Sequence, residues 1–416
     1  MIGSELPKGW KLVPLKEITS IIRGVSYPKE EAKLHPEENY VHILRGGNIQ
    51  DGKIVFETDD NVYVNSSLVG EEQFVLKDDV VIVASTGSKK VIGKAATIEE
   101  DSRCISFGAF LLLLRTNVID KRFHSYFFQT QYYRNTISSL AGGININNIK
   151  KEHIENLQIP LPPLTEQKQI AEKLDKLFDQ IETIKEASNK IPELLKNFRQ
   201  QVLTYAVTGK LIESTPEPRM LGELIDELKY GTSKKADYDI EGFPVLRIPN
   251  INNGEIDSTD LKYVPLDDKE YNQLALQEGD ILVIRSNGSL SIVGQCAIVR
   301  KECENWVYAG YLIRIRCTHE LLPEYLNYIF QSYQVRKQIV EKSHSMSGVN
   351  NFSADKIKQL EIAWYPVEVQ KQIVEKLNSI FGKLNEIEKQ YNTLCEKLDK
   401  LPQTLLCKAF KGELNR

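Results

Sequence analysis

Apolar residues recur every three to four positions through two long stretches of the chain, and both stretches carry nearly the same pattern. Residues 159–211 and 362–414 align without a gap at a shift of 203 residues, with 19 identities in 53 positions. An ungapped match of this length indicates one structural unit that is used twice. The repeat therefore defines the architecture before any single element is assigned.

Within each copy the spacing predicts a long amphipathic helix with a narrow apolar seam of the a/d heptad type. A seam this narrow suits a second helix better than the broad face of a sheet, so we expect the two copies to pair in antiparallel. The alternative is that each helix lies only on its own domain. Pro192 and Pro402 are expected to kink or interrupt the helices. The seam continues through Phe198, and its predicted helix-pairing residues are Ile170, Leu174, Leu177, Ile181, Ile184, Ile373, Leu377, Ile380, Leu384 and Ile387.

Upstream of each helical stretch lies a block with mixed strand and helix signals, and the two blocks match more loosely than the helices. Strand and turn residues alternate in both blocks, and an amphipathic helix and an Asn-rich loop follow them. The matched segments are a strand with an Asn/Gly turn (41–54 and 243–256), two strands with a Gly/Ser loop (78–98 and 279–299), a third strand (110–115 and 311–316), a helix (about 126–137 and 325–340) and the Asn-rich loop (142–151 and 347–356).

The predicted fold class is therefore α+β: two repeated mixed α/β domains separated by an antiparallel coiled coil of two long helical regions, with a pseudo-twofold internal repeat. The predicted boundaries are 1–158 for the first block, 159–213 for the first helical region, 214–361 for the second block and 362–416 for the second helical region. A helix of about 27 to 43 residues is roughly 40 to 65 Å long. Such a spacer is compatible with DNA half-sites one or two helical turns apart.

Net charge and composition do not decide whether the protein binds nucleic acid. The net charge of −4 argues against a nucleic-acid binder, but residues 121–151 and 281–301 contain basic residues and no Asp or Glu. These stretches can face phosphates while acidic surfaces lie elsewhere, or they can be solvated basic faces. The opening residues show no signal peptide or membrane span, and the six cysteines have no paired spacing. A cytoplasmic protein with free thiols is expected.

A search for catalytic motifs finds none. The segment 87–95, GSKKVIGKA, has its glycines six apart, and Ala95 stands where a phosphate loop needs Ser or Thr, so a hairpin loop is the better interpretation. No Gly-rich βαβ turn for a dinucleotide or methyl donor is present, and the six histidines lack ligand spacing. The sequence thus predicts no cofactor, no metal and no enzyme activity of its own.

With these features the chain resembles the DNA specificity subunit of a Type I restriction–modification system. The resemblance is carried by IPLPPLTEQKQIAEKLD (159–175) and IPELLKNFRQQVLTYAVTGKL (191–211), by their second copy, and by the opening PKGWKLVPLKEI (7–18). The second copy departs from the pattern, with WYPVEVQ and FKGEL in place of LPPLTEQ and VTGKL. The resemblance implies two target-recognition domains, which read a split, asymmetric site in double-stranded DNA, with the helices as a ruler. It also implies two adenine-methylating modification subunits and restriction/translocase subunits as partners, and no catalytic role for this subunit.

Candidate DNA contacts follow from comparing the two blocks. Residues that are equal in both copies cannot distinguish two half-sites and suit framework or phosphate roles, whereas residues that differ on matched loops are better base readers. For each of them a turn-capping or solvated loop residue is an open alternative. The candidates are Arg45, Asn48, Thr86, Lys89, Lys90, Asn147, Lys150, Lys151, Arg247, Asn250, Arg285, Asn287 and Asn350.

Two other functions stay open on sequence grounds. A pseudo-symmetric protein–protein scaffold would show the same repeat without binding DNA. A fused methyltransferase and specificity protein is disfavoured, because methyl-donor and NPPY-like motifs are absent from the sequence.

Overall fold

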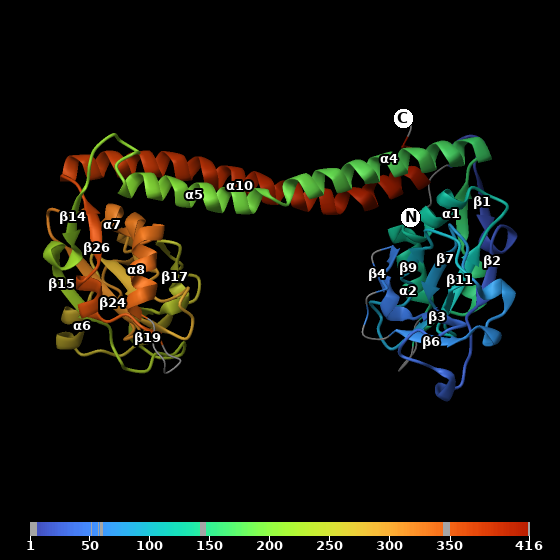
Figure 1. Cartoon of the computed structure of the whole chain (residues 1–416), viewed down its shortest axis with the longest axis horizontal. Helices are drawn as coiled ribbons and strands as arrows, with labels where there is room; N and C mark the ends of the chain where they lie inside the picture. Colours follow the sequence, from blue (N-terminus) through green and yellow to red (C-terminus); the bar gives the residue numbers. More distant parts are fainter. Residues whose placement is uncertain are drawn as a thin grey trace. The chain divides into compact units, whose positions relative to one another are not determined.

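The computed structural model describes residues 6–50, 52–56, 58, 61–141, 147–343 and 350–414. It divides into two compact units, which are treated separately below (Figure 1). Unit 1 comprises Met1–Ser188 with Thr393–Arg416, and unit 2 comprises Asn189–Asn392. Each unit therefore contains one block, the first part of the helical region that follows that block, and a helical segment of the other copy.

In unit 1 a four-stranded antiparallel sheet, in the order β2-β11-β7-β9, packs beside a three-stranded sheet in the order β10-β3-β6. Strand pairs β1-β13, β4-β5 and β8-β12 complete the block. The strands are β1 (Lys11–Pro14), β2 (Ser20–Arg23), β3 (Tyr40–Leu44), β4 (Ile49–Gln50), β5 (Lys53–Ile54), β6 (Val62–Asn65), β7 (Val80–Val83), β8 (Ser85–Thr86), β9 (Ala95–Thr97), β10 (Ile105–Phe107), β11 (Leu111–Arg115), β12 (Asn147–Asn148) and β13 (Gln158–Leu161); the helices of the block are α1 (Lys121–Phe128), α2 (Gln131–Leu140) and α3 (Lys151–Glu155).

Unit 2 repeats this topology, with sheets in the orders β15-β24-β20-β22 and β19-β16-β23 and with the pairs β14-β26, β17-β18 and β21-β25. Its strands are β14 (Glu217–Met220), β15 (Ile225–Tyr230), β16 (Phe243–Leu246), β17 (Ile251–Asn252), β18 (Glu255–Ile256), β19 (Lys262–Val264), β20 (Ile281–Ile284), β21 (Ser286–Asn287), β22 (Cys296–Ile298), β23 (Val307–Tyr308), β24 (Leu312–Cys317), β25 (Asn350–Asn351) and β26 (Glu361–Trp364); its short helices are α6 (Asp268–Leu274), α7 (Pro323–Ile329), α8 (Tyr333–Ser343) and α9 (Ala354–Lys358).

The continuous apolar strands of the sequence lie between two hydrophobic clusters. Successive side chains of a strand point to opposite faces, so Val80 and Ile82 of β7 pack with the helices, whereas Val81 and Val83 pack toward the three-stranded sheet. The matched strand β20 divides its residues in the same way in unit 2. An uninterrupted apolar run is the expected sequence of a strand that is buried on both faces.

The predicted single helix of each block is instead two short helices, so that prediction is wrong. In unit 1 the Thr130 hydroxyl donates to Phe127 O at 2.7 Å and accepts from Tyr133 N at 3.2 Å, which ends α1 and caps α2. Ser332 occupies the matched position between α7 and α8 and donates to Ile329 O at 2.6 Å. A capping hydroxyl inside an amphipathic pattern thus marks the break.

The first helical region forms α4 (Leu164–Ser188) and α5 (Ile191–Val207), and the second forms one helix, α10 (Val367–Phe410). Pro192 lies in the first turn of α5, so the predicted interruption there is confirmed. Pro402, in contrast, lies inside α10, which continues through that residue without an interruption. The turns around Pro402 are fixed by tertiary packing, because Leu398 and Leu406 are buried on either side of it. None of the helices described here is long and apolar enough to cross a membrane.

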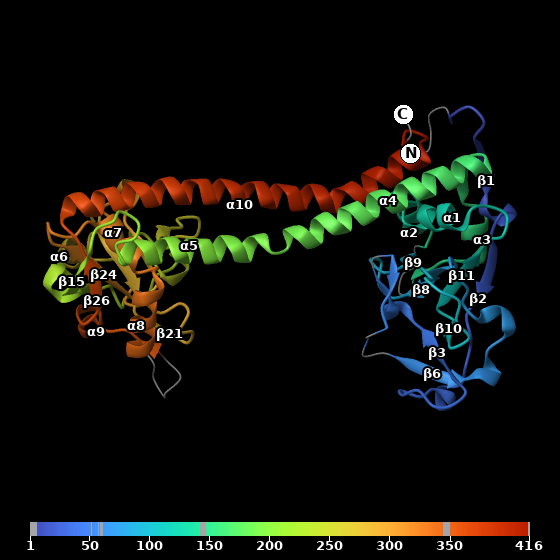
Figure 2. The same ribbon diagram turned by 45° about the horizontal axis from the view of Figure 1, so that its top comes forward.

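In both units the helices run antiparallel, as predicted (Figures 1 and 2). In unit 1, Lys173 of α4 donates to Leu414 O at 2.6 Å, and Lys185 further along α4 pairs with Asp399 of α10 at 2.9 Å. The partner number falls as the α4 number rises, which is the register of an antiparallel pair. In unit 2, Arg199 of α5 donates to Asn385 at 2.8 Å, and Lys376 of α10 donates to Leu211 O at 3.1 Å.

The predicted seam is buried over much of its length. Ile170 and Leu174 belong to the core of unit 1, and Ile373, Leu377 and Leu384 belong to the core of unit 2. Ile181 lies outside the core cluster of unit 1 but is only 4 % exposed. Leu177 and Ile380 are partly buried at the edges of these cores. Ile184 and Ile387, with Phe198, are between 44 and 47 % exposed. The buried part of the seam therefore does not include these three residues, and their role in helix pairing stays a prediction.

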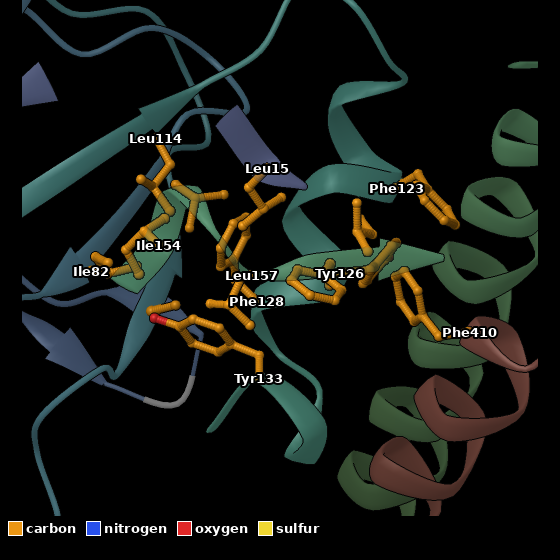
Figure 3. Packing of buried hydrophobic residues seen from close by; sticks show 14 of the residues in the cluster. Leu15, Ile82, Leu114, Phe123, Tyr126, Phe128, Tyr133, Ile154, Leu157 and Phe410 are labelled. Atoms are coloured by element: carbon orange, nitrogen blue, oxygen red, sulfur yellow. The ribbon is translucent and has the colours of Figure 1, made fainter. Parts of the chain in front are cut away.

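Each block packs against a helical segment of the other copy. In unit 1 the ring of Phe410, near the end of α10, lies 4.8 Å from that of Phe123 of α1 and 5.7 Å from that of Phe127 (Figure 3). In unit 2, Tyr365 before α10 donates its hydroxyl to Ala206 O of α5 at 2.9 Å. Helix–helix and helix–block packing are thus parts of one core, and the alternative in which each helix lies only on its own domain is wrong.

Glutamines at matched positions fasten the helices to the blocks. Gln167 of α4 is buried, accepts from Asp120 N at 2.9 Å and donates to Pro162 O at 2.8 Å. Its counterpart Gln370 accepts from Leu322 N at 2.8 Å. On the opposite helix of unit 1, Gln403 donates to Gln129 O at 2.9 Å and accepts from Gln131 N at 3.0 Å. Gln200 makes the matched contact in unit 2, to Gln331 O at 3.1 Å.

We predict that Leu174→Glu destabilises the protein by several kcal/mol, because it places a charge in a core from which water is excluded. Ile184→Glu, on the same helix and in the same heptad seam, should change the free energy of unfolding by less than about 1 kcal/mol, since that side chain is 44 % exposed. Denaturant unfolding of both variants measures the difference. Equal losses would show that the seam is buried along its whole length.

Candidate nucleic-acid interface

A two-stranded ribbon in each block brings together two segments that the sequence analysis singled out. In unit 1, β8 of the Gly/Ser loop pairs with β12 of the Asn-rich loop, with Thr86 opposite Asn147. In unit 2, β21 pairs with β25, with Asn287 opposite Asn350. The side chain of Asn147 lies outside the described residues. Candidate residues that are about 60 positions apart in the chain thus share one short ribbon in each block.

The loops that follow these ribbons are held from behind by an arginine. Arg134 of α2 donates to Ile92 O at 2.6 Å and to Lys90 O at 3.2 Å. Arg336 of α8 donates to Val293 O at 2.8 Å and to Leu290 O and Ser291 O at 3.3 Å each. Both guanidinium groups are half-buried under the loops, and this burial lowers the pKa of each. These two arginines fix the loop backbone and leave the loop side chains free to point outward.

Sequence reasoning missed this role. In the sequence Arg134 is only one of the basic residues of the stretch 121–151, and Arg336 is not among the candidate residues. The signal that could have found them is their matched position in the two copies, four residues after Thr130 and Ser332 respectively.

A glycine in each loop permits the close approach. Gly93 has φ +68°, and a Cβ atom there would lie 2.7 Å from Ile137 Cγ2 of α2. Gly294 has φ +74°, and its Cβ atom would lie 2.4 Å from Ile339 Cγ2 of α8. A side chain at either position would strain the backbone and displace the helix. The glycines of GSKKVIGKA therefore shape a loop between β7 and β9, which confirms the hairpin interpretation.

The basic candidates of block 1 lie on the surface around this ribbon. Lys89 and Lys90 are exposed at the loop tip, and Lys150 and Lys151 are exposed just after β12. Lys151 lies 3.6 Å from Glu155 on the same side of α3, a weak surface ion pair. Thr86 is half-buried, and its hydroxyl accepts from Ser88 N at 3.3 Å. Four lysines thus surround one ribbon, a suitable arrangement for a phosphate backbone.

Block 2 presents a different set of side chains on the same framework. Its loop carries Leu290 and Ser291 where block 1 has lysines. Arg285, at the start of the ribbon, stacks its guanidinium group 4.7 Å above the ring of Tyr230. The Asn287 carboxamide oxygen accepts from Ser289 N at 2.9 Å, and the buried Asn350 donates to Gly288 O at 3.0 Å. Arg285 and Asn287 are half-exposed, whereas Asn350 is used inside the loop.

The matched Asn48 and Asn250 are framework residues. Each carboxamide oxygen accepts from a backbone N–H three residues earlier, that of Arg45 or Arg247, at 2.8 Å. Each amide also donates to a carbonyl oxygen, that of Val55 at 2.9 Å or Asp257 at 2.8 Å. Both asparagines are 1 % exposed, so we leave them out of the proposed DNA contacts.

Each of these turns also carries an arginine at the matched position. The Arg247 side chain donates to the Asp260 carboxylate at 3.0 Å, which neutralises it locally. Arg45 is half-exposed on the matched turn of block 1. The turn is therefore the same in both blocks.

The titratable groups of the core that show shifted pKa values are buried among packed side chains. Burial lowers the pKa of His124 to about 3, and its Nε2 lies 2.8 Å from the Thr19 hydroxyl. Burial raises the pKa of the Cys296 thiol to about 12 and that of Cys303 to about 11, so both stay protonated and are weak nucleophiles. All six cysteines are unpaired. Among the described residues no group of three His, Cys, Asp or Glu side chains could hold a metal ion.

The fold and the duplicated ribbons define a class of protein that presents two equivalent, loop-bearing blocks on paired helices. The family model described as "Type I restriction modification DNA specificity domain" matches the chain twice, at residues 7–193 and 214–397. The chain belongs to this family.

Similar proteins support the assignment. The chain is 40 % identical to the Type I restriction enzyme EcoKI specificity subunit of Escherichia coli K12, over all of this chain and 91 % of that protein. It is 36 % identical to the StySPI specificity subunit of Salmonella potsdam, with the same coverage. The solved HsdS subunit of Thermoanaerobacter tengcongensis shares the fold over the full length of both chains, with a TM-score of 0.68 at 18 % identity. The prediction of a non-catalytic specificity subunit is thereby confirmed.

We predict that Arg134→Met releases the block 1 loop and that trypsin then cuts faster after Lys89 and Lys90. The loop carbonyls lose their donors, and an exposed loop tip with lysines is a preferred cleavage site. A time course with mass-spectrometric mapping of the cuts measures the rate. The control is Arg122→Met, because Arg122 of α1 binds Asp175 and touches no loop carbonyl. Equal cleavage rates in the two variants would exclude the anchoring role.

Proposed function

We propose that this chain reads a split, asymmetric site in double-stranded DNA, with one half-site for each block. One observation carries the proposal: the same ribbon, anchoring arginine and glycine are built twice, and the loop side chains on them differ. A constant framework with variable side chains is what two readers of different sequences need. Lys89 and Lys90 in block 1, and Arg285 and Asn287 in block 2, are the side chains best placed to meet the DNA.

The proposal includes partners that supply the chemistry. Two modification subunits would methylate adenine, and restriction/translocase subunits would move along and cleave DNA in the cytoplasm. Docking of partners on the helical regions is supported by apolar side chains that the units leave exposed: Leu194, Phe198 and Tyr205 in α5, and Leu394 and Leu401 in α10. Partners that embrace the DNA would also offset the net charge of −4.

The alternative function is that of a symmetric protein–protein scaffold that does not bind DNA. The four exposed lysines around one ribbon favour DNA instead. Binding to duplexes that contain the methylated target, in the presence of modification subunits, decides between the two. A scaffold would assemble with its partners and retain no sequence-specific DNA.

We predict that exchanging block 1 for that of a relative changes one half of the target and leaves the other half intact. The proposed block ends at residue 158, but β13 (Gln158–Leu161) pairs with β1, so the junction is better placed after Leu161. The matched control exchanges block 2 with a junction after Trp364, where β26 ends. Methylome sequencing gives the motif of each chimera. Independent reading is refuted when one exchange alters both half-sites.

We also predict that the helical regions set the length of the unspecified spacer in the target. α10 passes from unit 2 into unit 1, and the α4–α5 junction also joins the units, so both connections must lengthen together. Four residues inserted after Ala187 and four after the matched Gln390 add roughly 6 Å of helix to each connection. This length corresponds to one or two base pairs. Because four residues are close to one helical turn, each helix keeps its face.

Methylation mapping of this double variant should show the same bases at both ends and a longer spacer. The controls are the two single insertions. Each lengthens only one of the two connections between the units, so the two connections no longer match in length and activity should fall. An active double variant with an unchanged spacer would show that partner subunits, rather than the helices, position the blocks.

A further inference from the structure

Phe110 and Tyr311 are exposed aromatic residues at matched positions of the two blocks. Their shift of 201 residues also relates Thr86 to Asn287, and the side chains are 65 and 63 % exposed. Other rings of the blocks, such as those of Phe107 and Phe123, are fully buried. A single exposed apolar residue needs no explanation. The same exposure at both copies of one position is informative, because it is a property of the repeated framework.

Each ring sits on a tight turn that the fold holds rigidly. Leu111 N donates to Gly108 O at 2.8 Å, which closes the turn that carries Phe110. Leu312 N donates to Ala309 O at 2.9 Å and closes the turn that carries Tyr311. The leucine after each ring is fully buried at the start of β11 or β24. The backbone of the turn is therefore fixed, and the ring projects from it into solvent.

Backbone hydrogen bonds connect each turn to the ribbon of its block. In block 1, Ala84 N and Ser85 N donate to Phe110 O at 2.9 and 3.1 Å, and Ile149 N donates to Ala84 O at 2.8 Å. In block 2, Arg285 N donates to Tyr311 O at 2.9 Å, and Phe352 N donates to Arg285 O at 2.7 Å. The aromatic turn, the Gly/Ser strand and the Asn-rich strand thus lie side by side in the same order in both blocks.

We propose that Phe110 and Tyr311 contact the DNA directly, each ring packing against a base or deoxyribose of the half-site that its own block reads. This inference rests on the proposed function. An aromatic ring stacks on any base, so the contact tolerates different sequences. Apolar side chains also serve as wedges between base steps. A ring is kept at both positions, although lysines of one loop are replaced by Leu290 and Ser291 in the other. The retained ring therefore suits a contact that both blocks make with DNA, whereas the loop residues that differ suit the discrimination of base sequences.

The test measures binding of the whole chain, assembled with its modification subunits, to a duplex that carries the mapped methylation target. Phe110→Ala and Tyr311→Ala should each weaken binding about tenfold, the loss of one stacked ring. Phe110→Tyr and Tyr311→Phe keep the ring and should bind within about twofold of the unchanged protein. Val118→Ala is the matched control, because Val118 is also 65 % exposed in block 1. Should an alanine variant melt early, Phe110→Leu keeps the apolar bulk without the ring and gives the same comparison.

Salt dependence separates a ring contact from damage to the neighbouring loop. The ring carries no charge, so Phe110→Ala should leave the slope of log affinity against log salt unchanged. A disordered lysine loop would reduce that slope. Failure of the wild-type protein to bind its own methylation target would contradict the proposed function. If that protein binds and the alanine variants bind equally well, only the present inference is overturned. Loss of assembly with the modification subunits would assign the rings to a protein contact and would also overturn it.

Discussion

The architecture depends on the packing of each block against a helical segment from the other copy of the repeat. In unit 1, Ala409 and Phe410 of α10 are buried in the same core as Phe123 of α1. In unit 2, Leu203 and Ala206 of α5 share the core of Leu377. Separating the paired helices would expose both cores to water, so the helices cannot part while the blocks stay folded. Two buried glutamines, Gln167 and Gln370, add the polar contacts that orient each helix on its block.

This construction leaves the recognition loops free to differ. Their backbones are set by a glycine on the inner side and by an arginine from a neighbouring helix, and the tip residues Lys89 and Lys90 of block 1 are exposed. Specificity can then diverge at the loop tips without loss of stability. The same residue, asparagine, stands at positions 48 and 250 for a structural reason. Each side chain closes a turn of the block framework by a hydrogen bond to a carbonyl oxygen.

Much of the fold could be predicted from the sequence because it rests on local patterns. The ungapped repeat indicated the duplicated architecture, and the apolar runs of β7 and β20 indicated buried strands. Long-range packing could not be predicted in this way. Heptad spacing is the same at Leu174 and Ile184. The two residues differ because the block covers Leu174 and leaves Ile184 exposed. Pro402 is tolerated inside α10 for a similar reason, because its flanking leucines are buried.

Comparison of the two copies singles out the Gly/Ser loop and the Asn-rich loop of each block, but it does not predict that the two loops pair in one ribbon. Which of their side chains contact DNA stays a prediction. The anchoring role of Arg134 and Arg336 depends on which carbonyl groups lie within reach, and sequence spacing gives no information on that. The exposure of Phe110 and Tyr311 is likewise invisible in the sequence, where both residues simply begin an apolar strand.

The exchanged helices also have a consequence for synthesis of the chain on the ribosome. The apolar surface around Phe123 and Phe127 is covered only when Phe410, close to the C-terminus, has been made. At about 5 to 20 residues per second, synthesis from α4 to that residue takes on the order of ten to fifty seconds. During this interval the first block carries an uncovered apolar face, and such faces promote aggregation and chaperone binding. The nascent first half of the protein therefore keeps this apolar face uncovered until the last turns of α10 have been made.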